Sequence, residues 1–339
     1  MSNIEDNKTE EIKEIVSKAK VPSEAINEAV MRLSKLDALA YEQVREAEAD
    51  KLGVRKTALD SEVKKQRTLN LNTKDEGALF QNIEPWHEPV EPQALLDDIQ
   101  SLVRYYIVCN TETSIATTLW IAFTWFIDVV EVAPIAMITA PEKRCGKSQL
   151  LSLMSKLSAR PLLASNISPS AIFRIIEAHS PTLLIDEADS FLKENEEARG
   201  IINSGHTRSS AFIIRNVGDN HEPKQFSTWG AKAICGIGKQ ADTLMDRSVT
   251  LELRRKLPHE SVQRLRHAEP LQFEVFKSQL ARFSLDCLEE IKNARPNLPE
   301  ELNDRAQDNW EPLLAIADCA GGDWPKLARN AALKISGKE

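Results

Sequence analysis

The stretch Pro134–Leu151, which reads PIAMITAPEKRCGKSQLL, organises the rest of the chain. It begins with a short apolar run, Ile135 to Ile138, which predicts a β-strand. A polar loop follows and ends in Gly146-Lys147-Ser148, after which apolar residues recur at helical spacing. This order of strand, loop and helix is the context of a phosphate-binding loop. The sequence therefore predicts a nucleotide site, with ATP and Mg²⁺ as the cofactors.

Each part of the loop has an expected role in that site. Its backbone N–H groups and the positive end of the following helix would hold phosphate oxygens. Lys147 would reach the β- and γ-phosphates, and the hydroxyl of Ser148 would ligate Mg²⁺. Pro141 stands where the common pattern has its first glycine, so the entry to this loop must differ from the common form. The predicted cofactor-binding residues are Pro141, Glu142, Lys143, Arg144, Cys145, Gly146, Lys147, Ser148 and Gln149.

A second apolar run delivers two adjacent acids. Thr182 to Ile185 predicts a buried parallel strand, and Asp186 and Glu187 follow it directly. In a P-loop enzyme, Asp186 would hold Mg²⁺ through water and Glu187 would polarise the attacking water. The alternative is an ordinary strand end followed by a charged turn.

The composition indicates a globular protein without a global basic field. The 339 residues carry a net charge of −8, with 42% hydrophobic and 28% charged residues. The five cysteines are scattered, without a C-x-x-C pair or metal-ligand spacing, which predicts a reducing cytosol and no structural zinc. The polar start predicts no secretory signal, and we expect a cytoplasmic protein without a membrane partner. The apolar window Leu119–Val132 is too short to span a bilayer, so we expect a buried helix there.

The chain order predicts five segments. They are a flexible tail (1–22), a helical module (23–68), a linker (69–93), a P-loop ATPase core (94–257) and a helical lid (258–339). In the module, a helix that stops near Leu52-Gly53-Val54 and restarts near Thr57 is similar to a helix-turn-helix. The alternative is a helical hairpin that only packs against protein. Alternating strands and helices around the loop predict an α/β fold, a three-layer sandwich with a parallel sheet.

Longer motifs resemble a known family. They are TAPEKRCGKSQLL, PTLLIDEADSFLKENEEARGIINSGH, ADTLMDRSVTLELRRK and NDRAQDNWEPLLAIADCAGGDWPKLARNAAL. Together they resemble the bacterial domain of unknown function 3631, over roughly residues 95–333. Its members occur in phage and mobile-element proteins, often beside primase or replication modules. The order of elements looks like an AAA+ ATPase, nearest to superfamily 3-type helicases.

That resemblance implies further site residues and a self-assembly. Arg247 matches an arginine finger, which would act on a neighbouring copy in a ring or another head-to-tail homo-oligomer. The alternative for Arg247 is a salt bridge to Asp246 or to the lid. Arg305 would be a second sensor that swings from the lid onto the phosphates, although helical arginines are mostly solvated.

A hairpin from Ala211 to Trp229 is predicted between the acid strand and the next strand. The resemblance implies that it lines a pore and grips single-stranded DNA, through Arg215, His221, Lys224 and, at its root, Arg208. His206 lies at the same root and would alternatively sense the γ-phosphate. The plain alternative is a surface hairpin with ordinary charges.

Two functions fit this pattern. The first is an oligomeric ATPase, helicase or translocase, that moves on single-stranded DNA in phage or mobile-element replication, with a primase or another replication or defence protein as a further partner. The second is an AAA+ nucleotide switch, such as a loader, initiator or defence-associated ATPase, without unwinding activity. A small-molecule kinase would leave Arg247 and the acid pair without a role.

Overall fold

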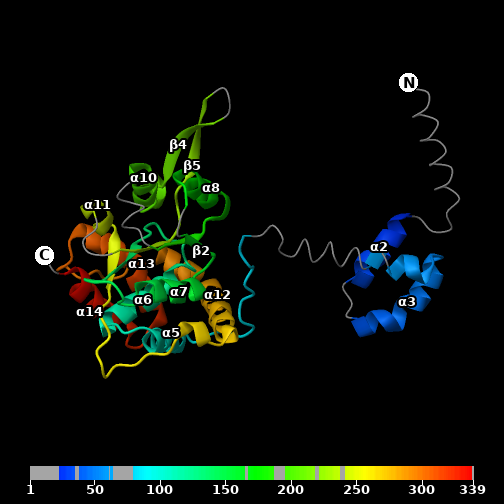
Figure 1. Cartoon of the computed structure of the whole chain (residues 1–339), viewed down its shortest axis with the longest axis horizontal. Coiled ribbons are helices and arrows are strands. Elements are labelled where there is room, and N and C mark those ends of the chain that lie inside the picture. Colours follow the sequence, from blue (N-terminus) through cyan, green and yellow to red (C-terminus); the bar gives the residue numbers. More distant parts are fainter. Residues whose placement is uncertain are drawn as a thin grey trace. The chain divides into compact units, whose positions relative to one another are not determined.

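The computed structural model describes residues 23–34, 38–60, 62–63, 79–164, 167–186, 195–217, 221–236 and 241–337. The chain divides into two compact units, Met1–Gln81 and Asn82–Glu339. Figure 1 labels their elements. The division lies inside the segment predicted as a linker. From Asn82 onward that segment is fixed to the larger unit, because the amide of Trp86 donates to the carbonyl of Ser278 at 2.9 Å.

The smaller unit is helical. It contains α2 (Ser23–Ser34), α3 (Ala38–Leu52) and a further helical stretch at 56–60 and 62–63. Gly53 ends α3 with a φ of +66°, and the amides of Gly53 and Val54 donate to Asp50 and Ala49, which closes the helix as a Schellman motif. The expected helix, turn and helix are therefore present. Their shared core is a set of buried apolar residues: Ala29, Val30, Leu33, Tyr41, Ala49, Leu52, Leu59 and Val63.

The larger unit alternates helices with strands. Its first half contains α5 (Pro92–Tyr106), α6 (Thr111–Phe123), β1 (Ile135–Thr139), α7 (Lys147–Leu157), β2 (Pro161–Ala164), α8 (Pro169–His179) and β3 (Thr182–Ile185). Its second half contains α10 (Glu196–Ser204), β4 (Phe212–Val217), β5 (Glu222–Ser227), β6 (Lys232–Cys235), α11 (Asp242–Met245), β7 (Ser248–Glu252), α12 (Pro270–Asn293), α13 (Asp304–Ala320) and α14 (Trp324–Ser336).

Five of the strands form one parallel sheet in the order β2-β3-β6-β1-β7. All four residues of β3 and all four residues of β6 are buried, as expected for strands covered on both faces. Side chains alternate between two cores: Ala136 and Ile138 of β1 enter one, and Ile135 and Met137 enter the other. The prediction of an α/β fold with a parallel sheet is confirmed.

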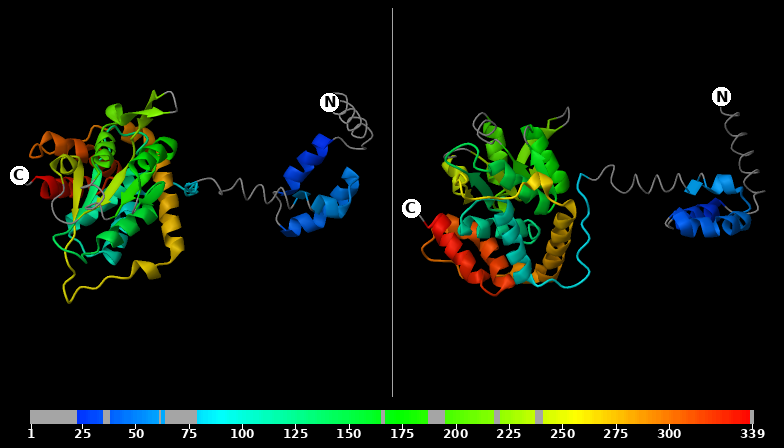
Figure 2. Two further views of the ribbon diagram at one scale, coloured as in Figure 1. Left: turned by 45° about the horizontal axis from the view of Figure 1, so that its top comes forward. Right: turned by 60° about the horizontal axis from the view of Figure 1, so that its bottom comes forward.

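Helices cover both faces of this sheet, so the unit has three layers (Figure 2). The larger core holds residues of α5, α6, α7, α12, α13 and α14, and the smaller core holds residues of α8, α10, α11 and β5. Helix α6 is buried from Thr113 to Phe123, so the apolar window Leu119–Val132 is buried where it begins. The helix predicted over the whole window ends at Phe123, and turns follow it. None of the described helices is both long and apolar enough to cross a membrane.

The C-terminal helices do not form a separate lid, contrary to the prediction for residues 258–339. Trp310 of α13 and Trp324 of α14 are fully buried, in the same core as α6 and one face of the sheet. Helix α14 packs on α6, and α12 packs on α5 and α7. The physical reason is that these helices bury apolar side chains in the larger core. A separate lid would leave that apolar surface in water.

Strands β4 and β5 form an antiparallel hairpin that projects from the body beside α8 and α10 (Figure 1). The expected hairpin is therefore present, although its tip at 218–220 lies outside the described residues. One face packs inward through Ile213, Val217 and Phe226. The opposite face carries Phe212 and Ile214, whose exposed fractions are 39% and 58%.

A buried lysine joins several elements where β6 begins. The ammonium of Lys232 donates to the carbonyls of Thr228 and Gly230 at 2.9 Å and to that of Gly205 at 3.4 Å. Gly205 follows α10 and lies so close that a Cβ there would stand 2.1 Å from the Thr228 carbonyl oxygen and 2.3 Å from the Lys232 nitrogen. Only glycine fits at this position.

We predict opposite effects for two glycine-to-alanine changes at α10. Gly205→Ala places a methyl group against a backbone carbonyl, so we expect the free energy of unfolding to fall by about 2 kcal/mol or more. Gly200→Ala lies inside the same helix with open space around it, so we expect it to stabilise by up to about 1 kcal/mol. Chemical denaturation measures both. Equal stability of the two variants would contradict the close packing at Gly205.

Candidate functional site

The predicted phosphate-binding loop lies at the carboxyl edge of the sheet, between β1 and α7. Helix α7 begins at Lys147, and its N-cap is Gly146, with a φ of +88° and no side chain to bond the first amides of the helix. Arg144 also has a positive φ, +67°. The first amides of a helix have no partners inside it, and the helix dipole makes this end positive. The loop thus presents backbone donors where an anion is favoured.

Side chains fix and line this loop. Cys145 is buried in the larger core and anchors the loop from below. The ammonium of Lys147 donates to the carbonyl of Glu142 at 3.4 Å, and the Glu142 carboxylate lies 3.5 Å from the guanidinium of Arg255. The predicted metal ligand Ser148 is exposed at the first turn of α7. The predicted residues 141–149 are therefore one surface feature, with the lysine folded onto the loop.

Asp186 lies at the same edge, at the end of β3. Ile185 is level with Ile234 of β6, which is level with Met137 of β1. Strands are roughly 4.8 Å apart, so Asp186 is separated from β1 by about 10 Å. Glu187, the predicted general base, lies outside the described residues.

Cys235 lies between these two groups. Its buried thiol donates to the carbonyl of Lys147 at 3.6 Å. Burial raises the pKa of Cys235; the carboxylate of Asp186 raises it further, whereas Lys147 opposes the shift. The thiol therefore experiences the field of the acid and of the loop lysine together. The loop that carries Lys147 and the strand end that carries Asp186 thus lie at one edge of the sheet, on either side of Cys235.

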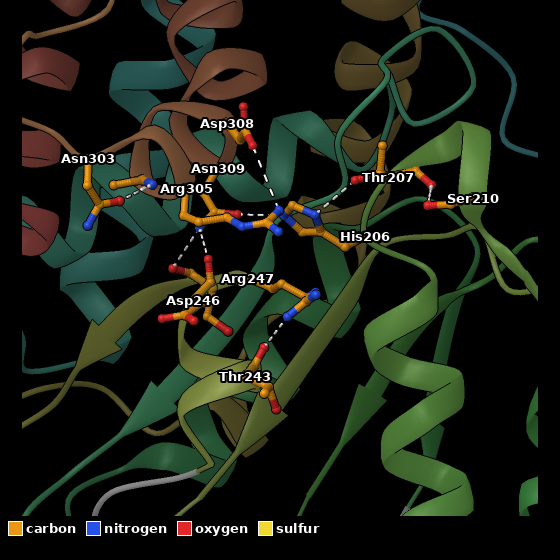
Figure 3. A network of polar contacts seen from close by, with 12 residues as sticks. His206, Thr207, Ser210, Thr243, Asp246, Arg247, Asn303, Arg305, Asp308 and Asn309 are labelled. Atoms are coloured by element: carbon orange, nitrogen blue, oxygen red, sulfur yellow. Dashed lines mark hydrogen bonds and ion pairs between the residues drawn. The ribbon is translucent and has the colours of Figure 1, made fainter.

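Arg247 lies at the opposite, amino edge of the sheet. Its carbonyl accepts a hydrogen bond of 2.9 Å from the amide of Ile135, the first residue of β1. Its guanidinium donates to the carbonyl of Thr243 at 2.7 Å (Figure 3). The phosphate-binding loop follows the other end of β1, five residues and roughly 16 Å further along.

A buried polar network joins this edge to α13 (Figure 3). His206 Nε2 bonds Asn309 Oδ1 at 2.8 Å, and Asn309 Nδ2 donates to the carbonyl of Asp246 at 2.9 Å. Because Asn309 donates through its nitrogen, His206 Nε2 carries the proton, and Nδ1 accepts from the hydroxyl of Thr207. Burial lowers the pKa of His206, while Asn309 partly offsets this. His206 is a neutral structural histidine, not a group directed at the loop.

Arg305 belongs to this amino edge as well. It lies one turn from Asn309 on α13, and its guanidinium approaches Asp308 at 4.0 Å (Figure 3). The structure therefore places Arg305 with Arg247 around His206, whose pKa both arginines lower. It does not bring Arg305 to the phosphate-binding loop of its own chain, which was the expectation from the lid.

The residues predicted to bind nucleic acid divide into two groups. Arg215 and Lys224 are directly opposite each other on the inward face of the hairpin. Arg215 pairs with Glu197 at 2.9 Å, and Lys224 lies over the ring of Phe226. His221 is exposed next to the tip, with a φ of +53°. Lys224, in the third residue pair from the tip, and His221 are exposed, whereas Arg215 is held by a carboxylate.

Arg208 has a structural role, so the prediction that it binds phosphate is not supported by its contacts. Its guanidinium donates to the carbonyls of Val130 at 2.9 Å and Ile127 at 2.7 Å. It also stacks on Trp229, 4.8 Å from the ring centroid. These contacts fix the loop after α6, and the carbonyl of Ile127 also accepts from Trp229 Nε1 at 3.1 Å.

In the helical module, basic side chains likewise pair with groups of the protein itself. Residues 23–63 contain nine acidic and six basic side chains. Arg32 pairs with Glu48, Arg45 with Asp60 and Lys56 with Glu46. The basic residues at 64–67 lie outside the described residues. The described part of the module therefore favours the alternative of a helical unit that packs against protein.

Three residues of these two edges were missed by sequence reasoning. Lys232 gave a weak signal, a lysine inside the apolar run from Ala231 to Ile237. Cys235 looked like any apolar strand residue, and Asn309 like any polar residue of a helix. Their positions depend on contacts between segments far apart in the chain, which a local pattern does not encode.

Comparison with known proteins finds a match to a family model at the C-terminal end of the chain. Residues 252–339 match the family model "Protein of unknown function (DUF3631)". This is the C-terminal part of the region, 95–333, over which the motifs were expected to resemble that family. A curated relative from Saccharopolyspora erythraea, "Uncharacterized 28.9 kDa protein in xis 5'region", is 40% identical over 84 residues. That alignment covers 24% of this chain and 31% of the relative.

Two solved structures share a distant likeness. "The A form apo structure of NrS-1 C terminal region-CTR" is 16% identical with a TM-score of 0.35, and covers 71% of this chain and 53% of its own. A second form, "CTR(305-718)", is 15% identical with a TM-score of 0.33, and covers 73% and 57%. The chain thus spans little more than half of these structures and about a third of the curated relative. What the comparisons establish is that residues 252–339 match a family of unknown function.

Proposed function

We propose that the larger unit is a Mg²⁺-dependent ATPase that acts as a homo-oligomer on single-stranded DNA. One observation carries this proposal: the phosphate-binding loop and the strand acid lie at the same carboxyl edge of a parallel sheet, on either side of Cys235. Ligands of open α/β sheets bind at this edge.

The residues present fit a nucleotide and its metal. The first amides of α7 have no cap from Gly146, and Lys147 donates to a carbonyl of its own loop at 3.4 Å. An anionic group at the loop offers that ammonium a stronger partner. Ser148 and Asp186 supply hard oxygen ligands of the kind Mg²⁺ prefers.

The roles of the chain's own groups follow from this placement. Mg²⁺ bound there would supply positive charge that offsets the negative charge developing on the terminal phosphates. The α7 amides and Lys147 orient the phosphates, and Ser148 and Asp186 hold the metal. Glu187, next to Asp186 in the sequence, accepts the proton of the attacking water. These roles come from residue chemistry and position.

Arg247 acts on a neighbouring copy in this proposal. It lies at the amino edge of the sheet, at the far end of β1 from the loop of its own chain. A head-to-tail arrangement, in which the amino edge of one copy faces the loop of the next, is heterologous, and it gives a ring where its rotation closes and an open filament where it does not. Arg305 is at the same edge and would face the same neighbour.

The DNA-binding part of the proposal rests on the projecting hairpin and on context. Lys224 and His221 are exposed on the hairpin, and His221 is beside its tip. The relative's name places that protein in a xis 5′ region, which suits a mobile-element setting and a replication partner such as a primase. The outward face of the hairpin favours the second candidate function, a nucleotide switch. Phe212 and Ile214 are exposed apolar side chains, which suit contact with protein better than contact with phosphate.

The first prediction for this proposal concerns the loop. Lys147→Ala should lose ATP affinity at least tenfold, because the ammonium contacts the β- and γ-phosphates. Glu187→Gln should bind ATP normally and lose at least a hundredfold in hydrolysis, because an amide does not accept the proton. Calorimetry and a phosphate-release assay separate the two effects. Unchanged ATP affinity of Lys147→Ala would exclude the loop as the nucleotide site.

The second prediction concerns Arg247. Arg247→Ala should bind ATP yet hydrolyse it on the order of 10³-fold more slowly, the effect of a missing arginine finger. Mixing this variant with Lys147→Ala should restore part of the rate, because some interfaces then pair an intact loop with an intact Arg247. Lack of recovery, with mixed oligomers confirmed by sedimentation, would contradict action between copies.

The third prediction separates the motor from the switch. Single-stranded DNA should raise the ATPase rate several-fold, and His221→Ala/Lys224→Ala should lose that rise while keeping the basal rate. Lys326→Ala, which removes an exposed lysine on α14, is the matched control and should respond like the wild type. A wild-type rate that ignores DNA would favour the switch.

A further inference from the structure

Two cysteines and a glutamate converge between α12 and α13, far from the residues assigned above. Cys287 and Glu290 are one helical turn apart on α12, so they lie on the same face of that helix. Cys319 comes from the last turn of α13. The two Sγ atoms and a carboxylate oxygen of Glu290 lie within 4.8 Å of one another. The cysteines are 32 positions apart, which is why no sequence motif indicated them.

These distances suit a small, thiophilic cation. In a tetrahedral zinc site the metal–sulfur distance is about 2.3 Å, which puts two sulfur ligands roughly 3.8 Å apart. Three ligand atoms within 4.8 Å reach that geometry by small side-chain rotations. Glu290 is exposed whereas both cysteines are half-buried, so the fourth ligand position is open to water.

The charges around the cluster also favour a cation. The charged groups that act on Cys287 are the carboxylates of Glu290 and Asp286, and Asp286 in turn pairs with Arg282 at 2.7 Å. The carboxylate of Glu290 therefore stands beside both thiols, and a divalent cation would neutralise part of that negative charge.

We propose that Cys287, Glu290 and Cys319 form a zinc-class metal site that joins α12 to α13. Two thiolates select a soft cation such as Zn²⁺ over Mg²⁺. The site would lock together two helices that complete the larger core, and so stabilise the layer on which α6 and α7 rest. It does not depend on the proposed ATPase activity.

The test uses the full chain, reduced with a phosphine and freed of metal by a chelator. Titration with Co²⁺ should show one equivalent per chain and a thiolate-to-cobalt charge-transfer band, which Zn²⁺ then removes by displacement. Zn²⁺ should also raise the melting temperature of the wild type. Excess Mg²⁺ should displace neither ion from the two thiolates, because Mg²⁺ prefers oxygen ligands, such as those at the phosphate-binding loop.

The variants make the test specific. Cys319→Ser should abolish the charge-transfer band, and Glu290→Gln, a change at an exposed residue, should weaken binding at least tenfold. Glu289→Gln lies next to it on the same helix, paired with Lys292, and should bind like the wild type. Absence of the band in the wild type, or its persistence in Cys319→Ser, would overturn the proposal. The proposal would also be overturned if Cys287 and Cys319 formed a disulfide and bound no metal when reduced.

Discussion

The ammonium of Lys232 holds together the edge of the sheet on which the rest of the larger unit depends. It is fully buried at the start of a central strand, and its partners are three backbone carbonyls without a carboxylate among them. Burial lowers its pKa to about 7, whereas three acceptors favour the charged form and oppose that shift. An ammonium has three donors, and this site uses all of them. Loss of the side chain would leave the carbonyls buried without donors, which is more costly than the loss of the lysine itself.

The lysine determines where the neighbouring segments can lie. Gly205 must be glycine because the lysine and the Thr228 carbonyl occupy the space of a side chain. The next residue, His206, then lies where its carbonyl accepts from the amide of Ala133, and its ring reaches Asn309 of α13. One buried cation therefore fixes α10, the entry to β1 and a C-terminal helix in a single arrangement.

Local sequence patterns predicted the carboxyl edge of the sheet better than the amino edge. The loop at 141–149 and the strand before Asp186 are contiguous motifs, so period and composition sufficed to find them. The amino edge is assembled from His206, Asp246 and Asn309, which come from three separate segments, and no window contains more than one of them. The lid failed for a related reason: amphipathic periodicity shows that a helix packs, but not against which partner. The cations of the hairpin were assigned to nucleic acid by residue type and resemblance, whereas Arg215 and Arg208 find their partners inside the fold.

The separation of the two edges constrains how any nucleotide chemistry could be organised. A parallel strand places its two ends on opposite sides of the sheet, and β1 has the loop after one end and the Arg247 carbonyl bonded at the other. No rotation of one side chain joins groups roughly 16 Å apart along a strand. If Arg247 contributes to hydrolysis, it must therefore act on the nucleotide site of a second copy. The rigid network of His206 and Asn309 behind it would then present the arginine in a fixed position to that neighbour, without the entropy cost of ordering a loop.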